Sequence, residues 1–296
     1  MSLHQSISHL TKQEQNDLRH IVKTISAALQ PVLVFCFGIR LSQQLQRSCF
    51  SQKRRKENSN VIYDLLIILR DKDALTDEMA ATVAKRMIGS SINANILVHR
   101  LQFMKTQLLE MNFFFTWVHR SAIQLINRDN ALAQLQLQKK KTDILPVSQQ
   151  YMAAIKEELE KTRALLIQAS DNWLVQPFAI TLTALRQCAK EIIMALIKLG
   201  LGYDASHLSI EDSIKLSGNF CTILADVFPG NTPEEKKIYA LLTGSDTPEK
   251  IGHNELLLLL SRIKDLKQKV NDYQFSNSTL LKSHHEEQAK KINSLQ

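Results

Sequence analysis

Apolar residues in the first half of the chain follow two spacings, one typical of a helix and one typical of buried strands. Across residues 11–30 they recur at steps of three and four, which predicts an amphipathic helix that Pro31 ends. Short runs rich in branched and aromatic side chains follow, and such runs favour buried strands. We expect strands at residues 32–37, where Gly38 ends the run, and at 61–69, 92–101 and 122–127.

Two further segments between these strands have helical patterns. "TDEMAATVAKRMIG" (residues 76–89) begins with a capping residue and acids, and it ends in basic residues and a glycine. "FMKTQLLEMNFFFTWVHRS" (residues 103–121) is predicted as one helix. The resulting order of helices and strands predicts a small mixed-sheet domain, which we place at residues 1–142.

The pattern changes after "QKKKTDILP" (residues 138–146). Beyond Pro146 no run predicts a strand, and amphipathic segments follow one another with Gly and Pro between them. We expect helices at residues 151–170, 177–200, 210–228, 232–244 and 253–273. The chain is therefore predicted to be an α+β protein, in which an all-α helical bundle at 147–275 and a polar tail at 276–296 follow the mixed-sheet domain.

Composition narrows the class of protein more than the function. With 44% hydrophobic and 22% charged residues among 296, the chain resembles a soluble globular protein, and its length favours two domains. No apolar run is long enough for a membrane-spanning helix and the N-terminus has no signal-peptide core, so we predict a cytoplasmic protein without a membrane partner. The net charge of +8 fits a nucleic-acid or nucleotide partner, and it fits a soluble basic protein nearly as well.

The cysteines do not indicate a metal centre. There are 4 of them, without a CxxC pair and without other ligands at the spacing of a metal site. Cys36 and Cys188 lie in apolar or amphipathic runs, where a buried free thiol is the expected role. No metal site is predicted from these residues.

Two of the predicted strands carry residues that suggest a family. The first ends in "FG" at Phe37 and Gly38, and the second, "VIYDLLIIL", has Asp64 inside an apolar run. These residues and the order of elements resemble the minimal nucleotidyltransferase fold of the DNA polymerase β superfamily. In that family the first strand ends in Gly-Ser before a helix beneath the nucleotide phosphates. Its second strand carries Asp-x-Asp, which places two carboxylates on Mg²⁺, and a third acid lies on a later strand.

The chain departs from this family at the residues that perform the chemistry. Ile39 stands where the family has serine, Ile62 stands at the first acid, and Asp64 alone matches the acidic pair. No Asp or Glu lies within residues 90–109, so the third acid is missing as well. Because one carboxylate cannot hold a two-metal site, we predict that Asp64 is a relic and that no residue is catalytic.

The resemblance implies a nucleotide site at Gly38, Arg40 and Asp64, with ATP and Mg²⁺ as cofactors only where that site is functional. Plainer interpretations are a turn for Gly38 and a strand acid without a ligand for Asp64. A basic run is a weak nucleic-acid candidate, with a solvated loop as its alternative. It consists of Lys53, Arg54, Arg55 and Lys56.

The second half is similar to a HEPN domain, the helical partner that often follows this fold. The helix predicted at 177–200 precedes "GYDASHLSIEDSIKL", which has His207 where relatives carry a Thr-His-Asn-Leu-like turn. Ribonuclease members carry an Arg shortly before a His, and His253 has no such Arg, so the nuclease motif is absent. We predict a turn residue at His207 and a polar helix start at His253.

The preferred interpretation is a catalytically degenerate nucleotidyltransferase–HEPN protein that binds a nucleotide, RNA or a protein partner. One alternative is an active nucleotidyltransferase that transfers a nucleoside monophosphate to a protein or small molecule. Another is a purely structural dimerising module. A homodimer is predicted through the helix at 177–200, because its apolar residues nearly surround it. The competing explanation is that the first domain covers the second face of that helix.

Overall fold

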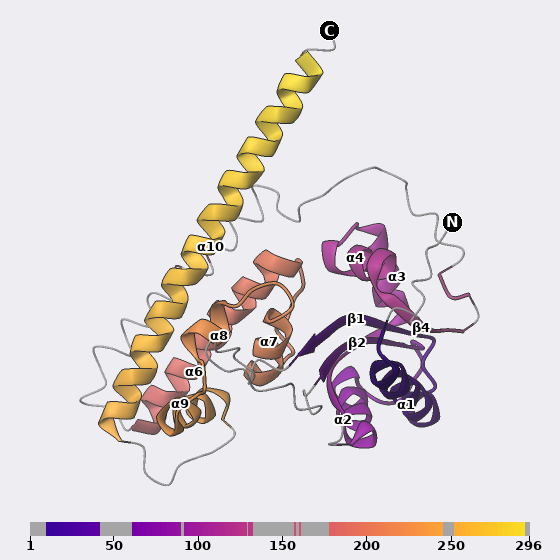
Figure 1. Cartoon of the computed structure of the whole chain (residues 1–296), viewed down its shortest axis with the longest axis horizontal. Coiled ribbons are helices and arrows are strands. Elements are labelled where there is room, and N and C mark those ends of the chain that lie inside the picture. Colours follow the sequence, from indigo (N-terminus) through magenta and orange to yellow (C-terminus); the bar gives the residue numbers. More distant parts are fainter. Residues whose placement is uncertain are drawn as a thin grey trace. The chain divides into compact units, whose positions relative to one another are not determined.

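The computed structural model divides the chain into two compact units, residues 1–142 and residues 143–296 (Figure 1). The structure describes residues 10–41, 61–89, 92–128, 130–132, 157, 160, 178–244 and 252–293. The basic run at 53–56 and nearly all of the helix predicted at 151–170 lie outside the described residues.

A four-stranded sheet organises the first unit. Its strands are β1 (Leu33–Leu41), β2 (Val61–Leu69), β3 (Asn93–Arg100) and β4 (Ile123–Asn127), in the order β3-β2-β1-β4. β1 runs antiparallel to β2 and β4, whereas β2 and β3 are parallel. The predicted mixed sheet is confirmed, and together with the helical second unit it gives the predicted α+β class.

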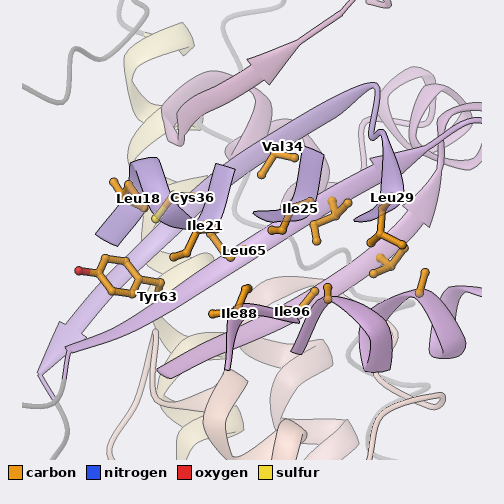
Figure 2. Close-up of a cluster of buried hydrophobic side chains, with 14 of the residues drawn as sticks. Leu18, Ile21, Ile25, Leu29, Val34, Cys36, Tyr63, Leu65, Ile88 and Ile96 are labelled. Atoms are coloured by element: carbon orange, nitrogen blue, oxygen red, sulfur yellow. The ribbon is translucent and has the colours of Figure 1, made fainter. Parts of the chain in front are cut away.

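One face of the sheet is covered by helices α1 (Lys12–Leu29) and α2 (Asp77–Ile88). Thr11 caps α1 in a capping box with Glu14, and Thr76 caps α2, so both helices begin where the sequence predicts. The apolar sides of the two helices pack on alternate residues of the strands (Figure 2). This core includes Leu18, Ile21, Ile25, Val34, Cys36, Tyr63, Leu65, Ile88 and Ile96.

Helices α3 (Leu101–Leu109) and α4 (Phe113–Ser121) cover the opposite face (Figure 1). The single helix predicted at 103–121 is therefore wrong. Met111 has a left-handed backbone with φ 55°, and the side chain of Asn112 accepts a hydrogen bond from the backbone N–H of Phe115 at 3.4 Å. An asparagine side chain that binds the backbone in this way starts a new helix and ends the previous one. After the break, Phe114 and Phe115 are both buried in α4.

β1 is longer than the apolar run indicates. The sequence predicts a strand that ends at Gly38, but the structure continues it to Leu41. A β-bulge lies between Cys36, which pairs with Leu65, and Gly38, which pairs with Asp64. The turn interpretation of Gly38 is therefore wrong: Gly38 lies inside a strand at a bulge, a position at which glycine is typical.

The second unit is helical, as predicted. It contains α6 (Phe178–Leu201), α7 (Ile210–Ser217), α8 (Ile223–Val227), α9 (Pro233–Thr243) and α10 (His253–Asn293). The single helix predicted at 210–228 is wrong, because α7 ends before Gly218 and α8 begins after a turn. The residues Ser-Gly-Asn at this point are turn formers.

α10 continues through residues 276–293, where the sequence predicts a tail. The segment is polar, and polarity argues against a core rather than against a helix. No Gly or Pro follows Gly252, and Lys, Glu, Gln and Leu, which favour helices, are frequent there.

α6 packs against α7, α9 and α10. Its residues Leu182, Leu185, Ile193, Leu196 and Ile197, which widen the apolar surface of the helix, are buried within the single chain. These apolar residues therefore need no second copy of the helix to bury them. Homodimerisation stays a prediction. None of the helices among the described residues is long and apolar enough to cross a membrane.

Candidate functional site

Asp64 occupies a fully buried position on β2. Its side chain is 0% exposed, in a strand whose other described residues from Tyr63 to Leu69 are buried and apolar. Tyr63 and Leu65 belong to the core beneath α1 and α2. Because successive strand residues point to opposite faces, Asp64 lies on the other face of the sheet. A buried carboxylate there requires donors for both of its oxygens.

Arg40 of β1 supplies two of these donors. Its Nε donates to Asp64 Oδ2 at 2.7 Å and its Nη2 donates to Asp64 Oδ1 at 2.9 Å. The Arg40 side chain is 22% exposed, so it reaches solvent while it binds the buried carboxylate. A two-pronged ion pair of this geometry is among the stronger charged interactions in proteins.

Asn95 of β3 supplies the third donor. β2 and β3 pair with Asp64 beside Asn95, and Asn95 Nδ2 donates to Asp64 Oδ1 at 2.6 Å. The facing atom is the amide nitrogen, since an ionised carboxylate only accepts hydrogen bonds. Asn95 is itself buried, with 7% of its surface exposed. The three residues form a hydrogen-bonded polar cluster, called the Arg40–Asp64–Asn95 cluster below.

The cluster does not fit a divalent metal ion. Both Asp64 oxygens already accept hydrogen bonds, from Arg40 and from Asn95. Ile62, the same-face neighbour two residues before Asp64, has no ligand atom in its side chain. Among the described residues, no group of three or more His, Cys, Asp or Glu side chains is placed to hold a metal.

The thiol of Cys36 is close to Arg40 in sequence, but it lies on the other face of the sheet from the cluster. Cys36 belongs to the core beneath α1 and α2, and its Sγ contacts the Gly38 carbonyl oxygen at 3.4 Å. Burial raises the pKa of this thiol to about 12, and the hydrogen bond to Gly38 offsets only part of that rise. The protonated thiol is therefore not a nucleophile at neutral pH. Its burial, and that of Cys188, agree with the prediction of free buried thiols.

The structure brings together the predicted nucleotide-site residues Gly38, Arg40 and Asp64, because Gly38 and Asp64 are cross-strand partners and Arg40 binds Asp64. Asn95 was missed. An available indication was the pair of asparagines at alternate positions in "NAN" (residues 93–95), which share one face of an otherwise apolar strand. The pairing that brings Asn95 to Asp64 could not be predicted, since it depends on which strands are neighbours.

The predicted histidines of the second unit lie in ordinary structural settings. His207 is in the loop between α6 and α7, with its Nε2 3.2 Å from the hydroxyl of buried Tyr203. Burial alone would raise the pKa of nearby Asp204, but hydrogen bonds from Ser206 lower it below its usual value. His253 is the first residue of α10. Both positions match the predicted turn residue and helix start.

Comparisons with known proteins find a distant similarity in structure. No family model matches the chain, and no curated protein matches it. Among solved structures, it is similar to a nucleotidyltransferase-like protein from Exiguobacterium sibiricum 255-15, with 13% identity and a TM-score of 0.29. The match covers 86% of this chain and 75% of that one. A similarity this distant carries no argument about function.

Proposed function

We propose that the first unit is a nucleotidyltransferase-like domain that binds a nucleotide and transfers nothing, and that the second unit is a HEPN-like helical domain. One observation supports the loss of transfer. The single carboxylate at the family's acidic positions, Asp64, already has both oxygens occupied by Arg40 and Asn95.

Nucleotidyl transfer needs metal ions that orient the triphosphate and stabilise its displacement. Those ions need carboxylates with free oxygens on one face of the sheet. This chain has Ile62 and Asn93 as paired neighbours on that face, and neither is an acid. A guanidinium and two amides can hold an anion through hydrogen bonds, but they cannot hold Mg²⁺. Nucleotide binding without transfer is the function that such a donor set favours.

The test of lost catalysis uses purified full-length chain with labelled ATP and Mg²⁺ or Mn²⁺, alone and with candidate acceptor proteins. We expect no label on the chain or on the acceptors. Asp64→Ala is the control, and label transfer that disappears in this variant would overturn the proposal.

The test of binding is the shift in melting temperature with ATP, with inorganic phosphate as the comparison ligand. We expect ATP to stabilise the chain and Arg40→Ala to reduce the shift, while Arg86→Ala, an exposed arginine of α2, leaves it unchanged. An absent shift with ATP would refute nucleotide binding and favour a purely structural module.

The predicted absence of nuclease activity in the second unit has its own test. Unstructured RNA incubated with the chain should remain intact, because His253 starts a helix without the arginine that the nuclease motif requires. RNA cleavage that His253→Ala abolishes would show that the second unit is an active nuclease.

A further inference from the structure

Arg40 spans both positions at which the resembled family carries its paired acids. In the β1–β2 ladder Arg40 is directly opposite Ile62, and its guanidinium reaches Asp64, one pair along the strand. Ile62 and Asp64 are two residues apart and therefore share a face. The charged end of Arg40 thus lies beside the place where two carboxylates would hold a cation between them.

The guanidinium and a divalent cation would compete for the same oxygens. The nitrogens of Arg40 lie 2.7 Å and 2.9 Å from the two oxygens of Asp64. Mg²⁺ binds carboxylate oxygens at about 2.0–2.1 Å and demands near-octahedral access to them. A planar fork that donates to both oxygens leaves no approach of that kind on its side of the carboxylate.

Asn95 binds Oδ1 from the opposite neighbouring strand without adding charge. Its amide donates to Asp64 Oδ1 at 2.6 Å from the neighbouring strand. Arg40 and Asp64 together carry no net charge, and an amide is neutral. A divalent ion that entered the cluster would meet a guanidinium at contact distance and no uncompensated carboxylate.

We propose that Arg40 is a built-in cation that takes the place of a divalent metal ion in the Arg40–Asp64–Asn95 cluster. The inference rests on the proposed function for its reference to a metal site. Its test does not, because the probe is Mn²⁺ alone and no nucleotide is present.

The experiment restores the missing acid and then removes the guanidinium. Ile62 is only partly buried, so Ile62→Asp is tolerable, and it places a second carboxylate directly opposite Arg40. Free Mn²⁺ is counted by electron paramagnetic resonance during titration of the full-length chain. We expect the wild type and Ile62→Asp to bind no Mn²⁺ that depends on Asp64, because the guanidinium is still present.

The double variant Ile62→Asp/Arg40→Gln should gain a Mn²⁺ site that is on the order of a hundredfold tighter than any residual Mn²⁺ binding of Ile62→Asp, since a unit positive charge has left contact distance. Ile62→Asp/Arg40→Lys keeps the charge and should stay without the site. Ile62→Asp/Arg86→Ala is the matched control for loss of an arginine elsewhere, and it should behave like Ile62→Asp.

Three results would overturn the inference. One is wild-type binding of Mn²⁺ that is lost in an Asp64→Asn chain shown by circular dichroism to be folded. Another is a folded Ile62→Asp/Arg40→Gln chain, verified in the same way, that binds Mn²⁺ no better than Ile62→Asp. Equal binding by the Gln and Lys double variants would equally contradict a role for the charge of Arg40.

Discussion

Removing the guanidinium of Arg40 leaves Asp64 as a buried and uncompensated charge. Asp64 is 0% exposed and, among the hydrogen bonds from described residues, would keep only the one from Asn95 Nδ2. Breaking a buried ion pair in this way costs about 3–5 kcal/mol in free energy of unfolding. The Arg40 side chain is 22% exposed, so water can reach part of the vacated space. We therefore expect Arg40→Ala to lose about 3 kcal/mol, at the lower end of that range.

The assay is urea denaturation of the full-length chain at neutral pH, followed by far-ultraviolet circular dichroism. The two units can unfold separately, so the transition is compared with that of Arg86→Ala, which should change by less than about 0.5 kcal/mol. The double variant Arg40→Leu/Asp64→Leu removes both charges. Its stability should lie within about 1–2 kcal/mol of the wild type, because replacing a buried pair by apolar residues is often close to neutral.

A loss of less than about 1 kcal/mol in Arg40→Ala, as expected of an exposed surface pair, would refute a buried ion pair at this position. A double variant Arg40→Leu/Asp64→Leu that is less stable than Arg40→Ala would refute it as well, because the penalty would then come from packing and not from an unpaired carboxylate.

Three further predictions concern sites away from the cluster. Gly200→Ala should lower the free energy of unfolding by about 1–3 kcal/mol, since the new Cβ would lie 2.1 Å from the ring of Phe220; urea denaturation measures the loss, and Phe220→Leu should reduce it. Burial, with a smaller contribution from the neighbouring arginine, lowers the pKa of His119 below its usual 6.5. The unfolded state therefore binds more protons than the folded state, so the free energy of unfolding should fall as the pH drops below 6.5. Urea midpoints measured across this pH range should fall less steeply in His119→Gln than in His20→Gln. Cys36, with a thiol pKa of about 12, should resist iodoacetamide at pH 8 until the chain is unfolded, as read by peptide mass spectrometry.

Each of these has a contrary outcome. An unchanged urea midpoint in Gly200→Ala would mean that the Phe220 ring moves aside freely. Equal pH dependence in the two histidine variants would show that His119 is as accessible to protons as an exposed residue. Alkylation of Cys36 in the folded chain would place its thiol outside the core.

Features that depend on neighbouring residues in sequence were predictable. Thr76 and Gly89 bound α2 as their local chemistry predicts, and β2 coincides with its apolar run. The split between α3 and α4 was missed because aromatic residues continue the helical spacing through Asn112, and a cap outweighed that pattern. Local signals of this kind compete, and the sequence alone does not rank them.

The site was predictable only in part. Asp64 is conspicuous in an apolar run, and the absence of acids at Ile62 and within residues 90–109 can be read directly. The partners of Asp64 cannot. Arg40 and Asn95 lie 24 and 31 residues away from it in sequence, on different strands. Which side chains meet there depends on strand order and register, which are set by the packing of the whole sheet.

The bulge in β1 determines which side chains of this strand lie beside Asp64. If β1 kept all of its residues but had no bulge, Phe37 would pair with Asp64, and Ile39 would lie opposite Ile62 in place of Arg40. Arg40 would then point toward α1 and α2, among hydrocarbon side chains. Deleting Phe37, the extra residue, would leave Arg40 opposite Ile62, because the deletion and the loss of the bulge cancel. Inserting one residue between Cys36 and Arg40 would instead turn the guanidinium toward the core and deprive Asp64 of its counter-ion, although every charged residue remained in the chain. An insertion at this point therefore changes the electrostatics of the site more than most substitutions can.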